Sequence, residues 1–245
     1  MTPFLFFAAV FLTALISAVF GMAGGLILMG VLAALYPVAG AMVAHGLIQS
    51  VSNAWRAALL RRFILWRTVA LFAAGSSIAA AALAFVSVTL EKPVLFVVLG
   101  LVPLLVWLPK NRFALDARRA VDGIAGGVLV TGLNVVAGVS GPLLDVFFQQ
   151  VDADRRAVVA TKAATQVLSH AVKIAYYAGA ALSLVNAPPL WMLALAVPLS
   201  IAGTTIGARV LERMSDAHFR AWTKWIVTGV GAAYVLRGLL LLGSG

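Results

Sequence analysis

Two sets of polar side chains recur at the same spacing in two separate parts of the sequence. The first set is His45, Gln49, Ser52, Asn53 and Arg56, and the second is Lys162, Gln166, Ser169, His170 and Lys173. In each set the residues lie at i, i+4, i+7, i+8 and i+11, which places them along one face of an α-helix. Amide, hydroxyl and ammonium groups on such a face can bind a polar solute, and imidazole can also carry a proton.

Apolar residues surround both of these polar stripes. A charged side chain at the centre of a bilayer costs about 2.5–3.5 kcal/mol even on the lower scales, so a stripe of this kind does not face lipid. We therefore expect the stripes to face the protein interior or an aqueous cavity and to line the path of a substrate. Two alternatives remain open. The amides and hydroxyls can simply bond neighbouring helices, and Arg56 and Lys173, near the predicted helix ends, can extend to the membrane surface.

Two glycine-rich breaks interrupt apolar segments, at residues 21–25 (GMAGG) and 138–142 (GVSGP). Glycine adds backbone freedom and proline removes a hydrogen-bond donor, so both breaks predict discontinuous helices. A helix that begins at Gly24-Gly25, or at Gly141, exposes unpaired backbone N–H groups and the positive end of its dipole. Such ends bind anions. The alternative is that the small residues only permit close helix packing.

Asp145 is the only acidic residue well inside an apolar run. An intramembrane carboxylate either carries a coupling proton or pairs with a nearby cation, here Lys162 or Lys173. His45 or His170 are further candidates for a proton carrier. The candidate substrate-binding residues are Gly24, Gly25, Gln49, Asn53, Ser140, Gly141, Gln166, Ser169 and His170, and the candidates for coupling or charge pairing are Asp145, Lys162 and His45.

The composition identifies the environment of these groups. Of 245 residues, 63% are hydrophobic and only 11% are charged, and the mean hydropathy is +1.05. These values exclude a soluble domain and a disordered chain and indicate a polytopic helical membrane protein. The chain has no Cys, so it has no disulfide or thiolate metal site. We expect no metal and no cofactor. The net charge of +10 lies in short connections between apolar runs and marks topology, not nucleic-acid binding.

Apolar runs long enough to cross a bilayer need roughly 20 residues. Residues 1–20 lack a basic leading segment, so we expect a spanning segment there and not a cleaved signal peptide. The candidate spans are 4–20, 40–60, 66–88, 93–109, 120–137, 157–180, 189–208 and 219–242. Two shorter apolar pieces, 24–36 and 141–150, follow the glycine breaks.

The sequence contains an internal repeat. A shift of 117 positions brings Gly21 onto Gly138, Gln49 onto Gln166 and Arg56 onto Lys173. We therefore predict two homologous halves within a single membrane domain. The first repeat is 1–110, with a hairpin at 4–36 and helices at 40–60, 66–88 and 93–109; the second is 118–245, with a hairpin at 120–150 and helices at 157–180, 189–208 and 219–242.

The basic residues decide the orientation of the halves. Fourteen of the 18 Lys and Arg residues lie in connections; eight simple crossings would divide them seven to seven. If each broken region returns to its starting side, 13 lie on one side and only Lys92 on the other. The second arrangement satisfies the positive-inside rule, with basic connections cytoplasmic and both termini periplasmic. Each half then crosses an odd number of times, which predicts an all-α membrane protein of two inverted repeats, each a broken-helix hairpin plus three transmembrane helices. Inverted repeats with broken helices are typical of secondary transporters.

Several of these features resemble the sulfite exporter TauE/SafE family. They are the G-x-x-G-G break, the polar helix, the Arg-rich turn with Trp66, the small-residue helix around Gly75, and in the second half G-x-x-G-P followed by the helix with Arg155-Arg156. The usual family signature is G-x-G-G-G, and Ala23 and Ser140 each replace one glycine here. The resemblance implies export or uptake of sulfite, an organosulfonate such as sulfoacetate, or a related small organic anion across the bacterial inner membrane.

Together these patterns predict a secondary transporter of a small anion that works by alternating access. The expected partners are the anionic substrate and the lipid bilayer; proton coupling and a homodimer stay open, and no nucleic acid is expected. We do not expect an enzyme, because the chain lacks H-E-x-x-H and G-x-S-x-G motifs and has too few acidic residues for a two-metal site. The alternatives are an anion channel and an accessory membrane subunit without transport activity.

Overall fold

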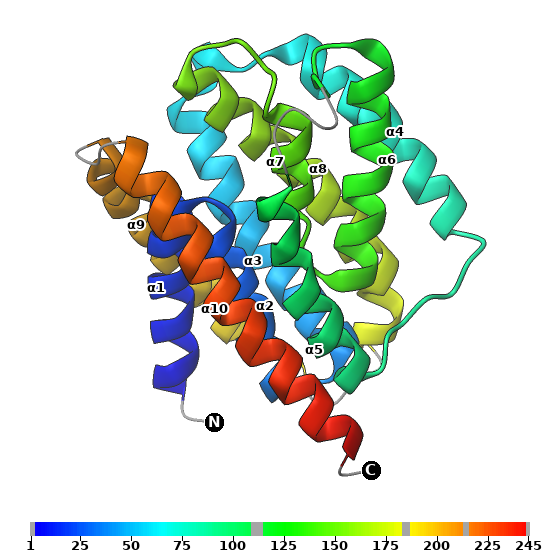
Figure 1. Ribbon diagram of the computed structural model, residues 1–245. Helices are drawn as coiled ribbons and strands as arrows, with labels where there is room; N and C mark the ends of the chain where they lie inside the picture. The colour runs from blue at the N-terminus through cyan, green and yellow to red at the C-terminus, as the bar shows by residue number, and fades with distance from the viewer. Residues whose placement is uncertain (1–2, 109–114, 183–186, 213–215, 244–245) are drawn as a thin grey trace.

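The computed structural model describes residues 3–108, 115–182, 187–212 and 216–243, with side chains except at 180–182, 211–212 and 216–223. Over these residues the chain is helical and contains no β-strand, which confirms the all-α prediction. The helices, shown in Figure 1, are α1 (Pro3–Phe20), α2 (Met22–Leu35), α3 (Val38–Leu59), α4 (Trp66–Leu83), α5 (Lys92–Leu101), α6 (Ala120–Ala137), α7 (Gly141–Phe148), α8 (Arg155–Leu182), α9 (Leu190–Glu212) and α10 (Asp216–Gly243), with short 3₁₀ helices η1 (Arg61–Phe63) and η2 (Val102–Trp107).

Three predicted boundaries were wrong. The helix expected to begin at Gly24-Gly25 begins at Met22, because the chain reverses at Gly21, whose φ of 65° is open to glycine. The helix expected over 66–88 ends at Leu83, where β-branched residues and a serine lower helix propensity.

The third boundary concerns the helix expected over 93–109. It becomes a 3₁₀ helix after Leu101 because Pro103 cannot donate a backbone hydrogen bond. Residue 109 itself lies outside the described residues.

Five of the described helices are long and apolar enough to cross a membrane, namely Pro3–Phe20, Trp66–Leu83, Ala120–Ala137, Leu190–Val210 and Lys224–Gly243. The two helices that carry the polar stripes, α3 and α8, pack along each other and along helices of both halves. Most of their stripe residues are buried within the protein, for example Gln49 at 4% and Ser169 at 1% exposed, whereas Arg56, Lys162 and Gln166 are half-buried. The polar stripes therefore face protein and not the outer surface.

Helix pairing follows the predicted repeat. α1 packs along α9, while α6, its counterpart in the second half, packs along α4, the counterpart of α9. α3 pairs with its own counterpart α8, and α5 with α10 (Figure 1). α3 and α8 run in opposite directions, since Arg156 lies over Phe63 at one end and Lys173 contacts His45 at the other. This arrangement is consistent with inverted repeats.

Small residues permit two equivalent helix contacts. Gly75 of α4 lies so close to the α6 backbone at Ile124 that a methyl group would overlap it. Gly203 of α9, the residue matched to Gly75 in the sequence, makes the same kind of contact with the α1 backbone at Phe11. Close backbone approach through glycine is the usual packing device of membrane helices.

The basic connections gather at one end of the helix bundle. There Arg156 stacks on the Phe63 ring with 4.3 Å to its centroid, and Arg118 Nη1 donates to the Asp152 carbonyl oxygen at 2.8 Å. Lys92 lies at the opposite end, near the carbonyl oxygen of Ala34. This separation agrees with the 13-to-one count from the sequence. The residues Lys110, Arg112 and Arg213 and the side chain of Arg220, which entered that count, lie outside the described part.

Candidate functional site

A small cavity of about 30 Å³ lies where the two helix breaks meet α3 and α8. Its volume is enough for roughly two water molecules, at about 10–15 Å³ for each. Both breaks contribute to its wall, as inverted symmetry predicts. The lining residues are Ser17, Gly21, Met22, Gly25, Leu26, His45, Gln49, Val139, Ser140, Gly141, Gln166 and His170.

The glycines of the breaks shape this cavity. Gly21 and Gly138 have positive φ angles of 65° and 79°, which side chains other than glycine rarely adopt. At Gly25, an added Cβ would lie 3.0 Å from Nε2 of Gln49, so only glycine lets this amide approach the first turn of α2. The break on the other side places Ser140 as the N-cap residue of α7. The first turns of α2 and α7 thus border the cavity with their dipole ends.

The side-chain amides of Gln49 and Gln166 also border the cavity. These two residues match in the sequence repeat, and here they come from the facing helices α3 and α8. Among the described residues neither side-chain amide has a hydrogen-bond partner. Neither of them is among the fully buried polar groups that lack a partner. Both amides are therefore available to a ligand in the cavity.

Behind one wall of the cavity lies a buried lysine. Lys173 is 0% exposed, and its Nζ lies 2.8 Å from the carbonyl oxygen of Gly138, 2.7 Å from Nδ1 of His45 and 3.3 Å from Oδ1 of Asn134. Among the described residues no carboxylate pairs with it. The predicted alternative in which Lys173 extends to the membrane surface is wrong, because α8 continues for a further nine residues and buries this position.

The same network reaches both cavity-lining histidines. Nε2 of His45 donates to the carbonyl oxygen of Gly25 at 2.9 Å. Asn134 Nδ2 lies 3.1 Å from Ser169 Oγ and 3.2 Å from His170 Nδ1. The two imidazole rings meet edge to face, with centroids 5.5 Å apart. A continuous chain of polar contacts therefore links Lys173 to the cavity.

An equivalent but weaker arrangement exists in the first half. Arg56 Nη2 lies 3.5 Å from Ser17 Oγ, which donates to the carbonyl oxygen of Gly21 at 2.9 Å. The shift of 117 positions relates Arg56 to Lys173, Ser17 to Asn134 and Gly21 to Gly138. In both halves a basic residue thus reaches back to the break glycine of its own repeat.

A larger vestibule of about 340 Å³ opens beside the cavity toward the basic end of the bundle. It shares with the cavity the residues Ser17, Gly21, Met22, Gly141 and Gln166. Four basic residues line it, namely Arg56, Arg155, Lys162 and Lys224. Its one acidic residue, Asp145, pairs with Lys162. The balance of charge is positive, which attracts anions.

The structure brings most of the predicted site residues together. Gly25, His45, Gln49, Ser140, Gly141, Gln166 and His170 line the cavity, and Asp145 and Lys162 line the vestibule.

The structure places three predicted site residues elsewhere. Gly24 packs on the α1 backbone, Asn53 donates to the backbone oxygen of Gln49, and Ser169 accepts from Asn134. For Ser169 the predicted alternative, a bond to a neighbouring helix, describes the observed contact, whereas the contact of Asn53 lies within its own helix. Asn53 lies on the stripe of α3 and Ser169 on the stripe of α8, but neither side chain lines the cavity.

Two residues near the site, Ser17 and Asn134, were not predicted from the sequence. Each is a polar residue in an apolar helix, and a single residue of this kind does not indicate a site. The repeat itself held the signal, because the shift of 117 positions superimposes them. Within the described residues, no group of three His, Asp or Glu side chains is arranged to hold a metal ion.

The family model described as Sulfite exporter TauE/SafE matches residues 6–234, nearly the whole chain. No curated protein and no solved structure matches the chain.

Proposed function

Because the chain belongs to the sulfite exporter TauE/SafE family of membrane transporters, we propose that it moves a small anion across the bacterial inner membrane by alternating access. The anion is sulfite, an organosulfonate such as sulfoacetate, or a related organic anion. The membership makes the chain a multi-pass membrane protein of a transporter family, in agreement with its apolar helices.

The observation that carries this proposal is the meeting of two unpartnered amides and two helix N-termini at one cavity. Backbone N–H groups at a helix start bind anions without a charged side chain. The amide N–H groups of Gln49 and Gln166 add donors from opposite sides. Such a site binds an oxyanion through several N–H donors at once.

The cavity and vestibule together fit the size of the proposed substrates. The cavity of about 30 Å³ suits a single oxyanion group, and the vestibule of about 340 Å³ has room for an organic tail. We propose that the sulfite or sulfonate group occupies the cavity and that the remainder of a larger anion points into the vestibule.

The test is anion flux in proteoliposomes that contain the purified protein. Replacing Gln49→Ala or Gln166→Ala removes a donor from the cavity and is expected to abolish sulfite flux while folded protein remains. Ser77→Ala, an exposed position on α4 that bonds only its own helix, is the matched control. Wild-type flux in both glutamine variants would contradict the site assignment.

The concentration dependence of flux separates the transporter from the channel. Alternating access saturates at high anion concentration, and internal anion accelerates uptake by exchange. Flux that rises linearly without exchange would favour a channel, and no flux for any tested anion would favour an accessory subunit.

A further inference from the structure

The donor and acceptor roles in the hydrogen-bond network behind the cavity follow from the groups that can only donate or only accept. A carbonyl oxygen only accepts hydrogen bonds, so the contact between His45 and Gly25 requires a proton on Nε2 of His45. Nδ1 of His45 is then a bare acceptor in the neutral ring, and it faces Nζ of Lys173 at 2.7 Å. The ammonium therefore donates to His45.

The remaining two protons of the ammonium have acceptors as well. One points to the carbonyl oxygen of Gly138 at 2.8 Å and one to Oδ1 of Asn134 at 3.3 Å. Three donors thus meet three acceptors, and the charged ammonium is fully satisfied although no carboxylate pairs with it in the described part.

The ammonium also fixes the amide of Asn134. Because Oδ1 accepts from Lys173, the NH₂ group of Asn134 must point the other way, toward Ser169 and His170. Nδ2 then donates to Nδ1 of His170 at 3.2 Å, which leaves that nitrogen without a proton. The proton of the neutral His170 ring therefore resides on Nε2.

Nε2 of His170 has no partner among the described residues, and His170 lines the cavity. We propose that Lys173 is a positioning residue for anion recognition. Its ammonium orients Asn134, Asn134 sets the tautomer of His170, and His170 presents an Nε2–H donor to the anion. This inference rests on the proposed function, since it assigns one donor of the same site.

Without Lys173, the donor and acceptor roles of Asn134 and His170 are expected to reverse. The amide of Asn134 is then free to rotate by half a turn, which turns Nδ2 toward the position that the ammonium occupied and Oδ1 toward His170. His170 moves its proton to Nδ1, and Nε2 becomes a bare acceptor that repels an anion. The groups that contact the Lys173 ammonium in the described part are His45 from α3, Asn134 from α6 and Gly138 from the turn after α6, and His170 on its own helix is a further titratable group close to it.

The test is ¹⁵N NMR of histidine-labelled protein in liposomes, together with sulfite binding to the same samples. The chain has three histidines, and His218→Gln removes the third resonance, while His170→Gln assigns the signal of interest. In the His218→Gln protein that is otherwise wild type, Nε2 of His170 is expected to be protonated. In Lys173→Met it is expected to be unprotonated, and sulfite affinity falls about tenfold or more, as for loss of a hydrogen bond to a charged group.

Asn134→Asp covers the case in which Lys173→Met does not fold. The carboxylate has nearly the shape of the amide and pairs with Lys173, but it has no N–H to donate. His170 must then carry its proton on Nδ1, so the same change of tautomer is expected. Arg56→Met, the equivalent position in the first half, is the matched control, and the His170 signal should not move.

The outcomes separate the inference from the proposed function. An unprotonated wild-type Nε2, or a protonated Nε2 in both Lys173→Met and Asn134→Asp, would overturn the inference alone. The same holds if the tautomer changes but sulfite affinity does not. A wild-type protein with a protonated Nε2 that binds neither sulfite nor any sulfonate would instead overturn the proposed function.

Discussion

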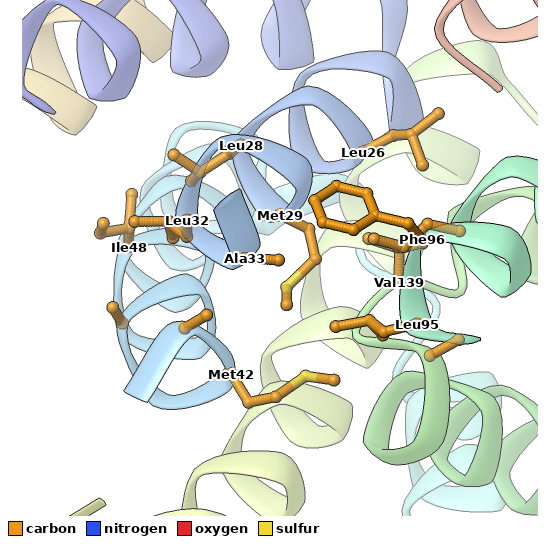
Figure 2. Packing of buried hydrophobic residues seen from close by; sticks show 14 of the residues in the cluster. Leu26, Leu28, Met29, Leu32, Ala33, Met42, Ile48, Leu95, Phe96 and Val139 are labelled. Atoms are coloured by element: carbon orange, nitrogen blue, oxygen red, sulfur yellow. The ribbon is translucent and has the colours of Figure 1, made fainter. Parts of the chain in front are cut away.

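The two sides of the central cavity are built from equivalent positions of the repeat, yet one is open and the other is filled. On the open side Arg56, Asp145 and Lys162 line a vestibule toward the basic end of the bundle. On the filled side the equivalent residues, Lys173, Leu28 and His45, are each at most 1% exposed. Figure 2 shows the packing around this side, where Leu28, Met29 and Leu32 project from α2 and Met42 projects from α3.

Under the proposed alternating access, one sequence repeat serves two states. If the halves are inverted, they can exchange their packing: the second half takes the packing of the first, and the first takes that of the second. In the resulting state the cavity is open to the opposite end of the bundle. The contacts of Lys173 would then loosen, and those of Arg56 would close. The predictions below test whether the open and filled sides differ as described.

The largest expected effect lies at two adjacent glycines of α2. A Cβ at Gly24 would overlap the α1 backbone at Thr13 and Ser17, so Gly24→Ala is expected to destabilise the protein by about 3 kcal/mol. A Cβ at Gly25 is tight only against the end of the flexible Gln49 side chain and makes an ordinary contact with Nε2 of His45. Gly25→Ala should therefore keep its stability but lower sulfite affinity. Denaturant unfolding and binding isotherms measure the two quantities, and equal unfolding midpoints for the two variants would contradict the geometry.

The next effect concerns the charge of the open side. Arg56→Glu places a negative charge in the vestibule, so the KM for sulfite is expected to rise by about 10-fold or more, and the effect should shrink at high salt. Arg62→Glu, at an exposed position outside the vestibule lining, is the control. If both variants raise KM equally, net charge and not the vestibule controls anion entry.

A smaller effect of opposite sign is expected at Asp145. Its pairing with Lys162 is partly exposed, with side chains 30% and 27% accessible, and such pairs are worth about 0.2–1 kcal/mol. Asp145→Asn releases Lys162 to the substrate, so KM should fall about two- to fivefold. Flux that loses its dependence on a pH gradient in this variant would instead identify Asp145 as the carrier of a coupling proton.

The smallest effect is expected among the basic connections, at a pair outside the vestibule lining. Arg118 donates several hydrogen bonds to Asp116, and these lower the pKa of the Asp116 carboxyl below its usual range. A carboxyl with a lowered folded-state pKa adds stability above its unfolded pKa of about 3.9, and this stability is lost as pH falls through the lowered value. Asp116→Asn should cost about 0.5–1 kcal/mol at pH 7, since Arg118 is partly exposed.

The pH dependence of that cost is the control. The difference in unfolding free energy between wild type and Asp116→Asn should shrink as pH falls below about 3.9, and it should disappear below the lowered pKa of folded Asp116, where that carboxyl is protonated. A difference that stays constant from pH 7 to pH 3 would mean that the aspartate carboxylate does not act through its charge.

The sequence was sufficient to predict the broken helices, the polar stripes that face the interior and the position of the basic connections at one end of the bundle. Each of these follows from local pattern and from the repeat. It did not separate the cavity residue His170 from its neighbour Ser169. Both lie on one stripe and both contact Asn134, on a helix more than 30 residues away, yet only His170 lines the cavity, because the packing of these helices decides which side chain reaches it. Contacts between distant segments leave no trace in the spacing of a single helix.

The difference between the open and filled sides was also beyond the sequence analysis. The two halves have matching polar stripes, and the asymmetry arises from how side chains fill space around them. Met42 is fully buried in the filled side, whereas its equivalent, Val159, lines the vestibule. Neither residue type alone predicts its exposure.

These two equivalent positions provide the most direct test of the central claim that a single cavity is reached from the basic end only. The chain has no Cys, so Val159→Cys and Met42→Cys each create a unique thiol. A membrane-impermeant thiol reagent is applied to either face of reconstituted vesicles. The account predicts that Val159→Cys reacts from the face that bears the basic connections, at least about 100-fold faster than Met42→Cys, because a buried thiol reacts only after an opening of several kcal/mol. Equal rates, or faster labelling of Met42→Cys, would contradict it.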